Sequence, residues 1–150
     1  MAMTFKESLD YGTEVEKEIL SYLQKTYPSA NKIEGKFKPF DIYIPETDTK
    51  IEIKTDVKSI ETNNYVVEIE MYNKPSGLLS TKADWWILTD KEQMIWIKPL
   101  TLLHTIIKHN LKWVTFTGKG DNHPKKAYLI KKELLVSAAE KINNYPNIKL

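Results

Sequence analysis

Acidic and basic side chains with a spacing suited to chemistry stand in two short alternating stretches, residues 40–44 and 51–54. Glu52 and Lys54 share one face of the second expected strand, and Asp41 lies on one face of the first. If the two strands form a hairpin, Asp41 and Glu52 become diagonal neighbours on one face, about 7–8 Å apart at the backbone. Two hard oxygen donors at that spacing suit Mg²⁺. The alternative is an exposed sheet face on which these charges form a cross-strand ion pair.

The register of this hairpin is expected to follow from a turn over residues 46–49. Pro45 then stands opposite Lys50, and Asp41 stands opposite Lys54. Such a register would bring a carboxylate, an ammonium group and the diagonal carboxylate to one place on the sheet.

A third acidic candidate lies on the first expected helix, residues 6–25. Val15, Ile19 and Leu23 recur there at helical spacing, and at 100° per residue Glu16 falls within their apolar stripe. A carboxylate that faces a core is costly unless it is paired or binds a metal. Glu16 is therefore a candidate site residue; the alternative is a Glu that reaches solvent or pairs with a lysine.

The remaining pattern predicts further strands, two further helices and a polar loop. One helix followed by a block of strands and then mixed elements indicates an α/β or α+β domain. The expected strands are 40–45, 51–55, 65–71, 85–88, 94–97 and 128–130; the expected helices are 100–109 and 133–143; the expected loop is 118–124.

Composition excludes several classes of protein. The 150 residues are 41% hydrophobic and 28% charged, as in ordinary globular domains, and the absence of cysteine excludes disulfides and cysteine-based zinc sites. No apolar run is long enough to span a membrane, and the N-terminus lacks the pattern of a signal peptide. We therefore expect one cytoplasmic domain spanning residues 1–150.

Charge is unevenly distributed along the chain. Residues 1–99 hold 13 lysines against 17 acidic residues, whereas residues 100–150 hold 9 lysines against 3. This division fits an acidic site beside a surface that binds a polyanion, although a solvated lysine-rich surface is the alternative. All 22 basic residues are lysines. The absence of arginine makes tight sequence-specific reading of DNA bases unexpected.

The order of these motifs resembles the PD-(D/E)XK nuclease superfamily, and its Holliday junction resolvase-like and phage-type members in particular. Those proteins carry a glutamate on the first helix, then an Asp, then Glu-x-Lys. The resemblance spans roughly residues 10–100, and two features depart from it: the lack of arginine, and a final third that matches nothing in the family. The matching stretches are 12–20, 39–41, 51–56, 65–70, 75–78 and 81–86.

The resemblance implies a restriction-endonuclease-like core, in which helices flank a central mixed β-sheet. It also implies a Mg²⁺-dependent DNA endonuclease, with Mn²⁺ able to substitute, that hydrolyses phosphodiester bonds. Such an enzyme would select branched DNA such as the four-way Holliday junction, act as a homodimer, and be encoded by a phage or prophage in a bacterial host.

Roles for individual residues follow from the same resemblance. Asp41, Glu52, Glu16 and the carbonyl of Ile53 would hold the metal, and Lys54 would orient the attacking water and neutralise phosphate charge. Glu68 is a possible further carboxylate, or a strand acid that faces solvent. DNA phosphates would be met by lysines of the basic loop and of the turn nearer the site: Lys82, Lys119, Lys125 and Lys126.

Two other functions remain open from the sequence. One is a different nuclease of the same superfamily, such as a restriction-type, nicking or DNA-degrading enzyme. The other is a DNA-binding module with this fold but no activity. The second is disfavoured because all four expected catalytic residues are present.

Overall fold

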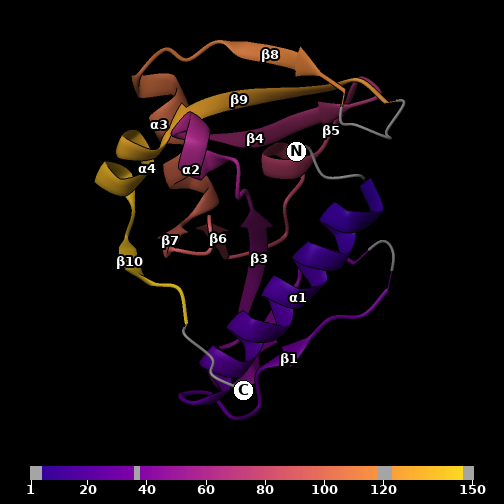
Figure 1. Ribbon diagram of the computed structural model, residues 1–150, viewed down its shortest axis with the longest axis vertical. Helices are drawn as coiled ribbons and strands as arrows, with labels where there is room; N and C mark the ends of the chain where they lie inside the picture. The colour runs from indigo at the N-terminus through magenta and orange to yellow at the C-terminus, as the bar shows by residue number, and fades with distance from the viewer. Residues whose placement is uncertain (1–4, 36–37, 118–122, 147–150) are drawn as a thin grey trace.

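The computed structural model describes residues 5–35, 38–117 and 123–146 (Figure 1). Its helices are α1 (Phe5–Gln24), α2 (Ser59–Thr62), α3 (Pro99–Lys108) and α4 (Lys132–Ala138), with 3-10 turns η1 (Pro45–Thr47) and η2 (Gly77–Leu79). Its strands are β1 (Asn31–Lys32), β2 (Ile42–Ile44), β3 (Thr49–Thr55), β4 (Asn64–Met71), β5 (Lys74–Pro75), β6 (Trp85–Thr89), β7 (Gln93–Ile97), β8 (Trp113–Phe116), β9 (Lys125–Lys131) and β10 (Lys141–Asn144).

The strands form two sheets. The larger has the order β1-β2-β3-β6-β7-β10, and it is mixed because β3 pairs with β6 in parallel while the other pairs are antiparallel. The smaller is antiparallel, with the order β5-β4-β9-β8. The expectation of an α/β protein with a mixed sheet is thus confirmed, and the second sheet is an addition that the sequence did not predict.

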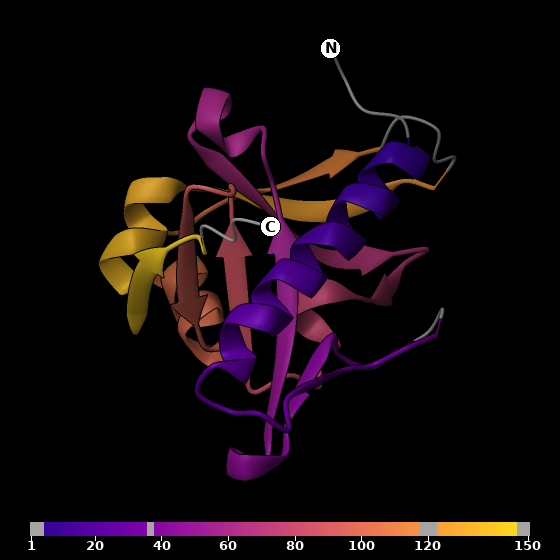
Figure 2. The same ribbon diagram turned by 60° about the horizontal axis from the view of Figure 1, so that its bottom comes forward.

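Helix α1 covers one face of the six-stranded sheet (Figure 2). Its buried side chains Val15, Ile19 and Leu23 pack in one cluster with Ile51 and Ile53 of β3. Because side chains alternate along a strand, the residues between these isoleucines point to the opposite face. The apolar stripe of α1 therefore decides which face of β3 carries Glu52 and Lys54.

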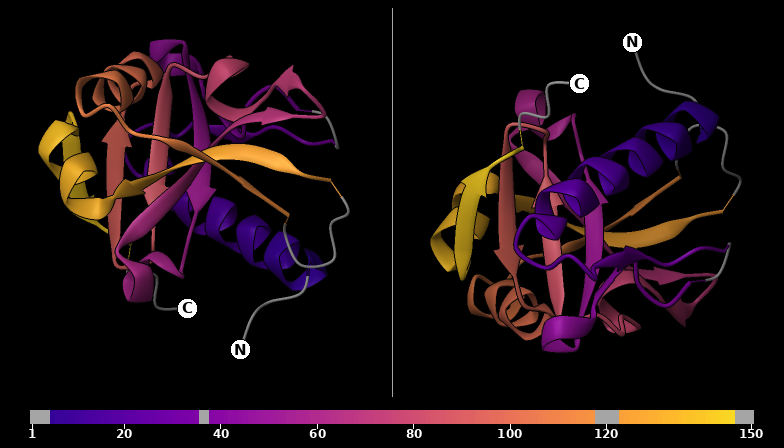
Figure 3. Two further views of the ribbon diagram at one scale, coloured as in Figure 1. Left: turned by 90° about the horizontal axis from the view of Figure 1, so that it is seen from above. Right: turned by 90° about the horizontal axis from the view of Figure 1, so that it is seen from below.

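The second sheet, with α3 and α4, lies across that opposite face (Figure 3). Trp86 and Leu88 of β6 are buried there against Tyr65 and Val67 of β4 and Leu102 of α3. The site residues of β3 thus share their face with the hydrophobic core around Trp86.

The hairpin of β2 and β3 forms as predicted, but its register is two residues off the expected one. Ile44 pairs with Thr49, so Pro45 belongs to the turn, where its fixed φ and missing N–H suit η1. Asp48 closes the turn in the left-handed conformation, φ 49°, and accepts a hydrogen bond of 2.6 Å from the Tyr43 hydroxyl. A shift of two residues keeps every side chain on its predicted face.

Most other predicted elements are confirmed, with two errors in the last third of the chain. The expected helix 133–143 ends at Ala138, and β10 follows and pairs with β7 instead. The edge of β7 supplies this pairing, and Asn143 of β10 accepts a hydrogen bond from the Trp96 indole. Strand β8 was not predicted, and the expected loop 118–124 lies mostly outside the described residues.

None of the helices within the described residues is long and apolar enough to cross a membrane.

Candidate active site

Asp41 is the residue around which the predicted site assembles. It directly precedes β2, it is 3% exposed, and its backbone N–H donates to the carbonyl of Ile51. Extending the observed register by one step places Asp41 directly opposite Glu52, not diagonal to it. One carboxylate oxygen accepts the backbone N–H of Ile53 at 2.7 Å, which fixes the side chain against β3.

The carboxyl groups of Asp41 and Glu52 lie close together across the hairpin, and each acts on the pKa of the other. Burial and this contact raise the pKa of Glu52 to about 8, against the opposing attraction of Lys54. Burial alone would raise the pKa of Asp41, but the hydrogen bonds from Glu52 and from the Ile53 N–H outweigh it and lower that pKa. A divalent cation would relieve the repulsion between two acidic groups that are held in contact across a hairpin.

Glu16 reaches the same carboxylate from the helix layer. Its side chain is 13% exposed and hydrogen-bonds to Asp41, and burial followed by this contact raises its pKa. The ammonium group of Lys38 lies 3.0 Å from Glu16 and 3.0 Å from Asp41, and Lys32 lies 3.3 Å from Glu16. Glu16 therefore lies beside Asp41 and is also paired with lysines, and its part in the chemistry stays a prediction.

Lys38 is the site residue that sequence reasoning missed. Burial disfavours its charged form, but its contacts with Glu16 and Asp41 outweigh burial and raise its pKa. The sequence offered one weak signal, a lysine three residues before Asp41. A second lysine, Lys36, stands two residues earlier, and nothing in the pattern separates the two.

Lys54 lies on the predicted face, and its ammonium group is placed over an aromatic ring. Its ammonium group sits 5.5 Å from the centre of the Trp86 ring, and Trp86 stands beside Glu52 in the β3–β6 register. The Trp86 indole N–H donates to the Thr81 hydroxyl at 3.0 Å. Thr81 thus holds the ring over which Lys54 lies, and the charge of Lys54 acts on Glu52.

Three other residues of the family-like stretches have structural partners. The backbone N–H of Lys50 donates to the Asp84 carboxylate at 2.9 Å, which clamps the start of β3. Asp56 accepts a bond of 3.4 Å from the N–H of Val66 and so links the two sheets. Glu68 forms an ion pair with Lys125 across β4 and β9, at 3.5 Å.

The lysines expected at DNA differ in how free they are. Lys82 is exposed in the turn before β6, and Lys119 lies outside the described residues. Lys125 pairs with a carboxylate, and Lys126 lies 3.8 Å from Glu70 and 4.5 Å from the centre of the Trp113 ring. The charges of Lys125 and Lys126 are therefore already partly balanced within the second sheet.

The residues fit a divalent cation by donor type. Asp41 and Glu52 are hard oxygen donors in contact, and they must otherwise share a proton near neutral pH. Ile53, whose carbonyl was the expected main-chain ligand, adjoins both and bonds to Asp41 through its N–H. Across the described ranges, however, no three acidic or histidine side chains form a ready-made ligand set for one ion. Lys38 supplies the positive charge beside Asp41 instead.

Comparison with known proteins gives no family: the chain matches no family model, no curated protein and no solved structure.

Proposed function

We propose that the chain is a Mg²⁺-dependent DNA endonuclease with a restriction-endonuclease-like core, and that it cuts branched DNA as a homodimer. The observation that carries the proposal is the contact between Asp41 and Glu52 across the β2–β3 hairpin, with Lys54 on the same face. This is the acid, acid and lysine set that the resemblance predicts, brought together from two strands. The mixed sheet, with α1 on one face carrying Glu16, supports the same proposal.

The roles of the side chains follow from where they lie. Asp41 and Glu52 would hold the ion with the carbonyl of Ile53; when bound, it makes a water molecule more acidic and stabilises charge on the phosphate. Lys54, held by Trp86, would orient that water and neutralise the scissile phosphate. Glu16 would keep Lys38 beside the site, where its ammonium group can meet a DNA phosphate.

A cleavage panel tests the proposal. A four-way junction, a flap, a linear duplex and a single strand of equal length are incubated with Mg²⁺, Mn²⁺ or Ca²⁺. We expect cutting of the junction with Mg²⁺ and Mn²⁺, and binding without cutting with Ca²⁺. Preference for one duplex sequence would point to a restriction-type enzyme instead, and no cutting of any substrate would contradict the endonuclease.

One observation favours a second candidate, a DNA-binding module without activity. Lys38 lies 3.0 Å from both Glu16 and Asp41, so an internal cation already neutralises part of the acidic cluster. In such a module the lysine would replace the metal permanently. Calorimetric titration with Mg²⁺ and Ca²⁺ separates the two functions, because only the nuclease requires saturable binding that is lost when Asp41 is replaced.

DNA affinity is expected to depend steeply on salt, since a chain without arginine must rely on lysine–phosphate contacts. Each phosphate neutralised on duplex DNA lowers log affinity by about 0.9 per log unit of salt. Replacing the exposed Lys82 by Ala should therefore reduce this slope by about one and weaken binding to all sequences equally.

The matched control for this measurement is Lys108→Ala, an equal change of charge at the exposed end of α3. Fluorescence anisotropy of a labelled junction across a salt series measures both slopes. An identical slope for the Lys82 and Lys108 variants would show that Lys82 does not contact a DNA phosphate.

A further inference from the structure

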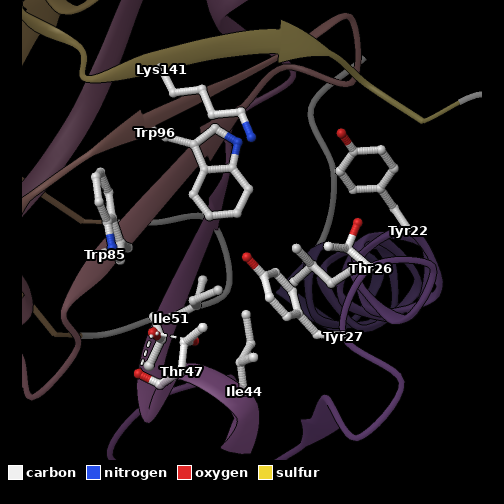
Figure 4. A pocket seen from close by; sticks show the side chains of 11 residues that line it. Tyr22, Thr26, Tyr27, Ile44, Thr47, Ile51, Trp85, Trp96 and Lys141 are labelled. Carbon is white, nitrogen blue, oxygen red and sulfur yellow. Dashed lines mark hydrogen bonds between the residues drawn. The ribbon is translucent and has the colours of Figure 1, made fainter.

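A pocket of about 300 Å³ lies on the helix side of the six-stranded sheet (Figure 4), and no residue of the acidic cluster lines it. We name it the aromatic pocket, and its walls come from the end of α1 and the loop after it, from the β2–β3 hairpin, and from β6, β7 and β10. The side chains that define it are Tyr27, Ile51, Trp85, Trp96 and Lys141. Ile51 points to this face of β3, whereas Glu52 points to the other, so the aromatic pocket and the Glu52 carboxyl group lie on opposite faces of one sheet.

The walls are flat rings. Trp85 and Trp96, neighbours on β6 and β7, meet edge to face with ring centres 6.2 Å apart, and the Tyr27 hydroxyl is directed toward the Trp96 ring (Figure 4). Thr47 and Thr49 add hydroxyl groups at the lower edge, where they bond to each other at 2.7 Å. Aromatic faces with a few hydroxyls beside them suit a planar ring that carries hydrogen-bonding edges.

Among the described residues that line the aromatic pocket, one carries a charge, and it is a lysine. Lys141 pairs with Trp96 in the β10–β7 register, and its ammonium group lies 5.3 Å from the centre of the Trp96 ring. No acidic residue is among the described residues that line the space. The ligand should therefore carry a negative charge, and an aromatic amino acid is disfavoured because its ammonium group would meet no carboxylate.

The Trp96 ring is held in place before any ligand arrives. Its indole N–H donates to Asn143 at 2.9 Å, and the Asn143 amide donates to the Tyr22 hydroxyl at 3.1 Å. These bonds join β7, β10 and α1 around the pocket. A wall fixed in this way loses little side-chain freedom on binding.

We propose that the aromatic pocket binds one unpaired nucleotide, with its base between Trp96 and Tyr27 and its phosphate on Lys141. A nucleotide joins a flat ring to an anion, and a pocket at the lower end of the roughly 300–1,000 Å³ range of ligand sites holds one such unit rather than two. The nucleotide is either free or an unpaired residue of a DNA strand. The inference goes beyond the proposed nuclease, because none of its residues belongs to the acidic cluster.

Quenching of tryptophan fluorescence tests the proposal in the intact protein, with free tryptophan as the control for absorbance. The probes are thymidine, thymidine monophosphate, a short oligothymidylate and a linear duplex. We expect saturable quenching by the monophosphate or the oligothymidylate and weaker binding of thymidine, and any quenching by the duplex should be unchanged when Lys141 is replaced. Binding of the free monophosphate would identify a nucleotide site, and binding of the oligothymidylate alone would identify a site for a strand.

Two variants with similar contacts make the test specific. Lys141→Ala should weaken nucleotide binding about tenfold, because it removes a charge-assisted contact to phosphate. Lys98→Ala removes a lysine that likewise lies over a tryptophan, 5.1 Å from the centre of the Trp85 ring, but does not line the pocket. The affinity of this variant for the nucleotide should stay within about twofold of the wild-type value.

Equal losses in the two lysine variants, or no saturable quenching by any probe, would overturn the proposal. The Asp41→Asn variant separates this result from the nuclease, since it should bind nucleotides normally whether or not the chain cuts DNA.

Discussion

Replacing Asp41 by Asn is expected to slow cleavage of the preferred DNA about a thousandfold, the largest effect of any single change that the structure indicates. Asp41 touches both other carboxyl groups and Lys38, so losing its charge removes the centre of the site. Asn keeps an oxygen that can accept the Ile53 N–H, and Lys38 keeps Glu16. The fold and DNA affinity should therefore change little.

The matched control is Asp48→Asn in the turn of the same hairpin. Asp48 is exposed and left-handed, a conformation that Asn adopts readily, and its partner is a tyrosine hydroxyl rather than the acidic cluster. Single-turnover cleavage, melting temperature and junction affinity are measured for both variants. Cleavage by the Asp41 variant at the rate of the Asp48 variant would place the chemistry elsewhere.

The hairpin shows how much of the site the sequence could predict. Alternation alone placed Asp41, Glu52 and Lys54 on one face, because the period of a strand is two and a register error of two changes no face. The sequence could not predict which residues stand opposite. The register depends on Pro45, which lies in the turn and not in the strand. Asp41 therefore stands directly opposite Glu52, whereas the expected register made the two diagonal.

The aromatic pocket shows what local patterns could not predict. Residues 133–143 have a pattern compatible with a helix, but beyond Ala138 the chain pairs as a strand with the edge of β7. Because a helix was expected at Lys141, the sequence did not indicate that this lysine lies over Trp96, a contact on which the pocket depends. Strand β8, by contrast, left a signal in the β-favouring run 113–116 that could have been used.

The acidic pair predicts an unusual dependence of stability on pH when no divalent cation is present. In the folded protein Glu52 holds its proton up to about pH 8, whereas an ordinary glutamate releases it near 4.5. Between these values the folded state binds a proton that the unfolded chain does not. The free energy of unfolding should therefore fall as pH rises from about 5 to 8, by about 3 to 4 kcal/mol, and level off above. The lowered pKa of Asp41 acts in a separate, more acid range, below its ordinary 3.8.

Glu52→Gln should flatten this slope, because the amide carries no charge at any of these pH values. At pH 8 without metal we expect the variant to be about 3 to 4 kcal/mol more stable than the wild type, a rise of roughly 10 °C in melting temperature. Glu14→Gln, the same change at an exposed position of α1, serves as the control and should follow the wild-type slope.

Thermal melts of the three proteins from pH 5 to 9, in a chelating buffer and then with Mg²⁺, measure the effect. Magnesium should stabilise the wild type more at pH 8 than at pH 6, since at pH 6 the ion must displace the shared proton, and it should stabilise the Glu52 variant least. A Glu52 variant that keeps the wild-type slope would assign the titration to another group. A wild type that gains stability from neither Mg²⁺ nor Ca²⁺ would favour Lys38 as the permanent cation of the site, and with it the DNA-binding module over the nuclease.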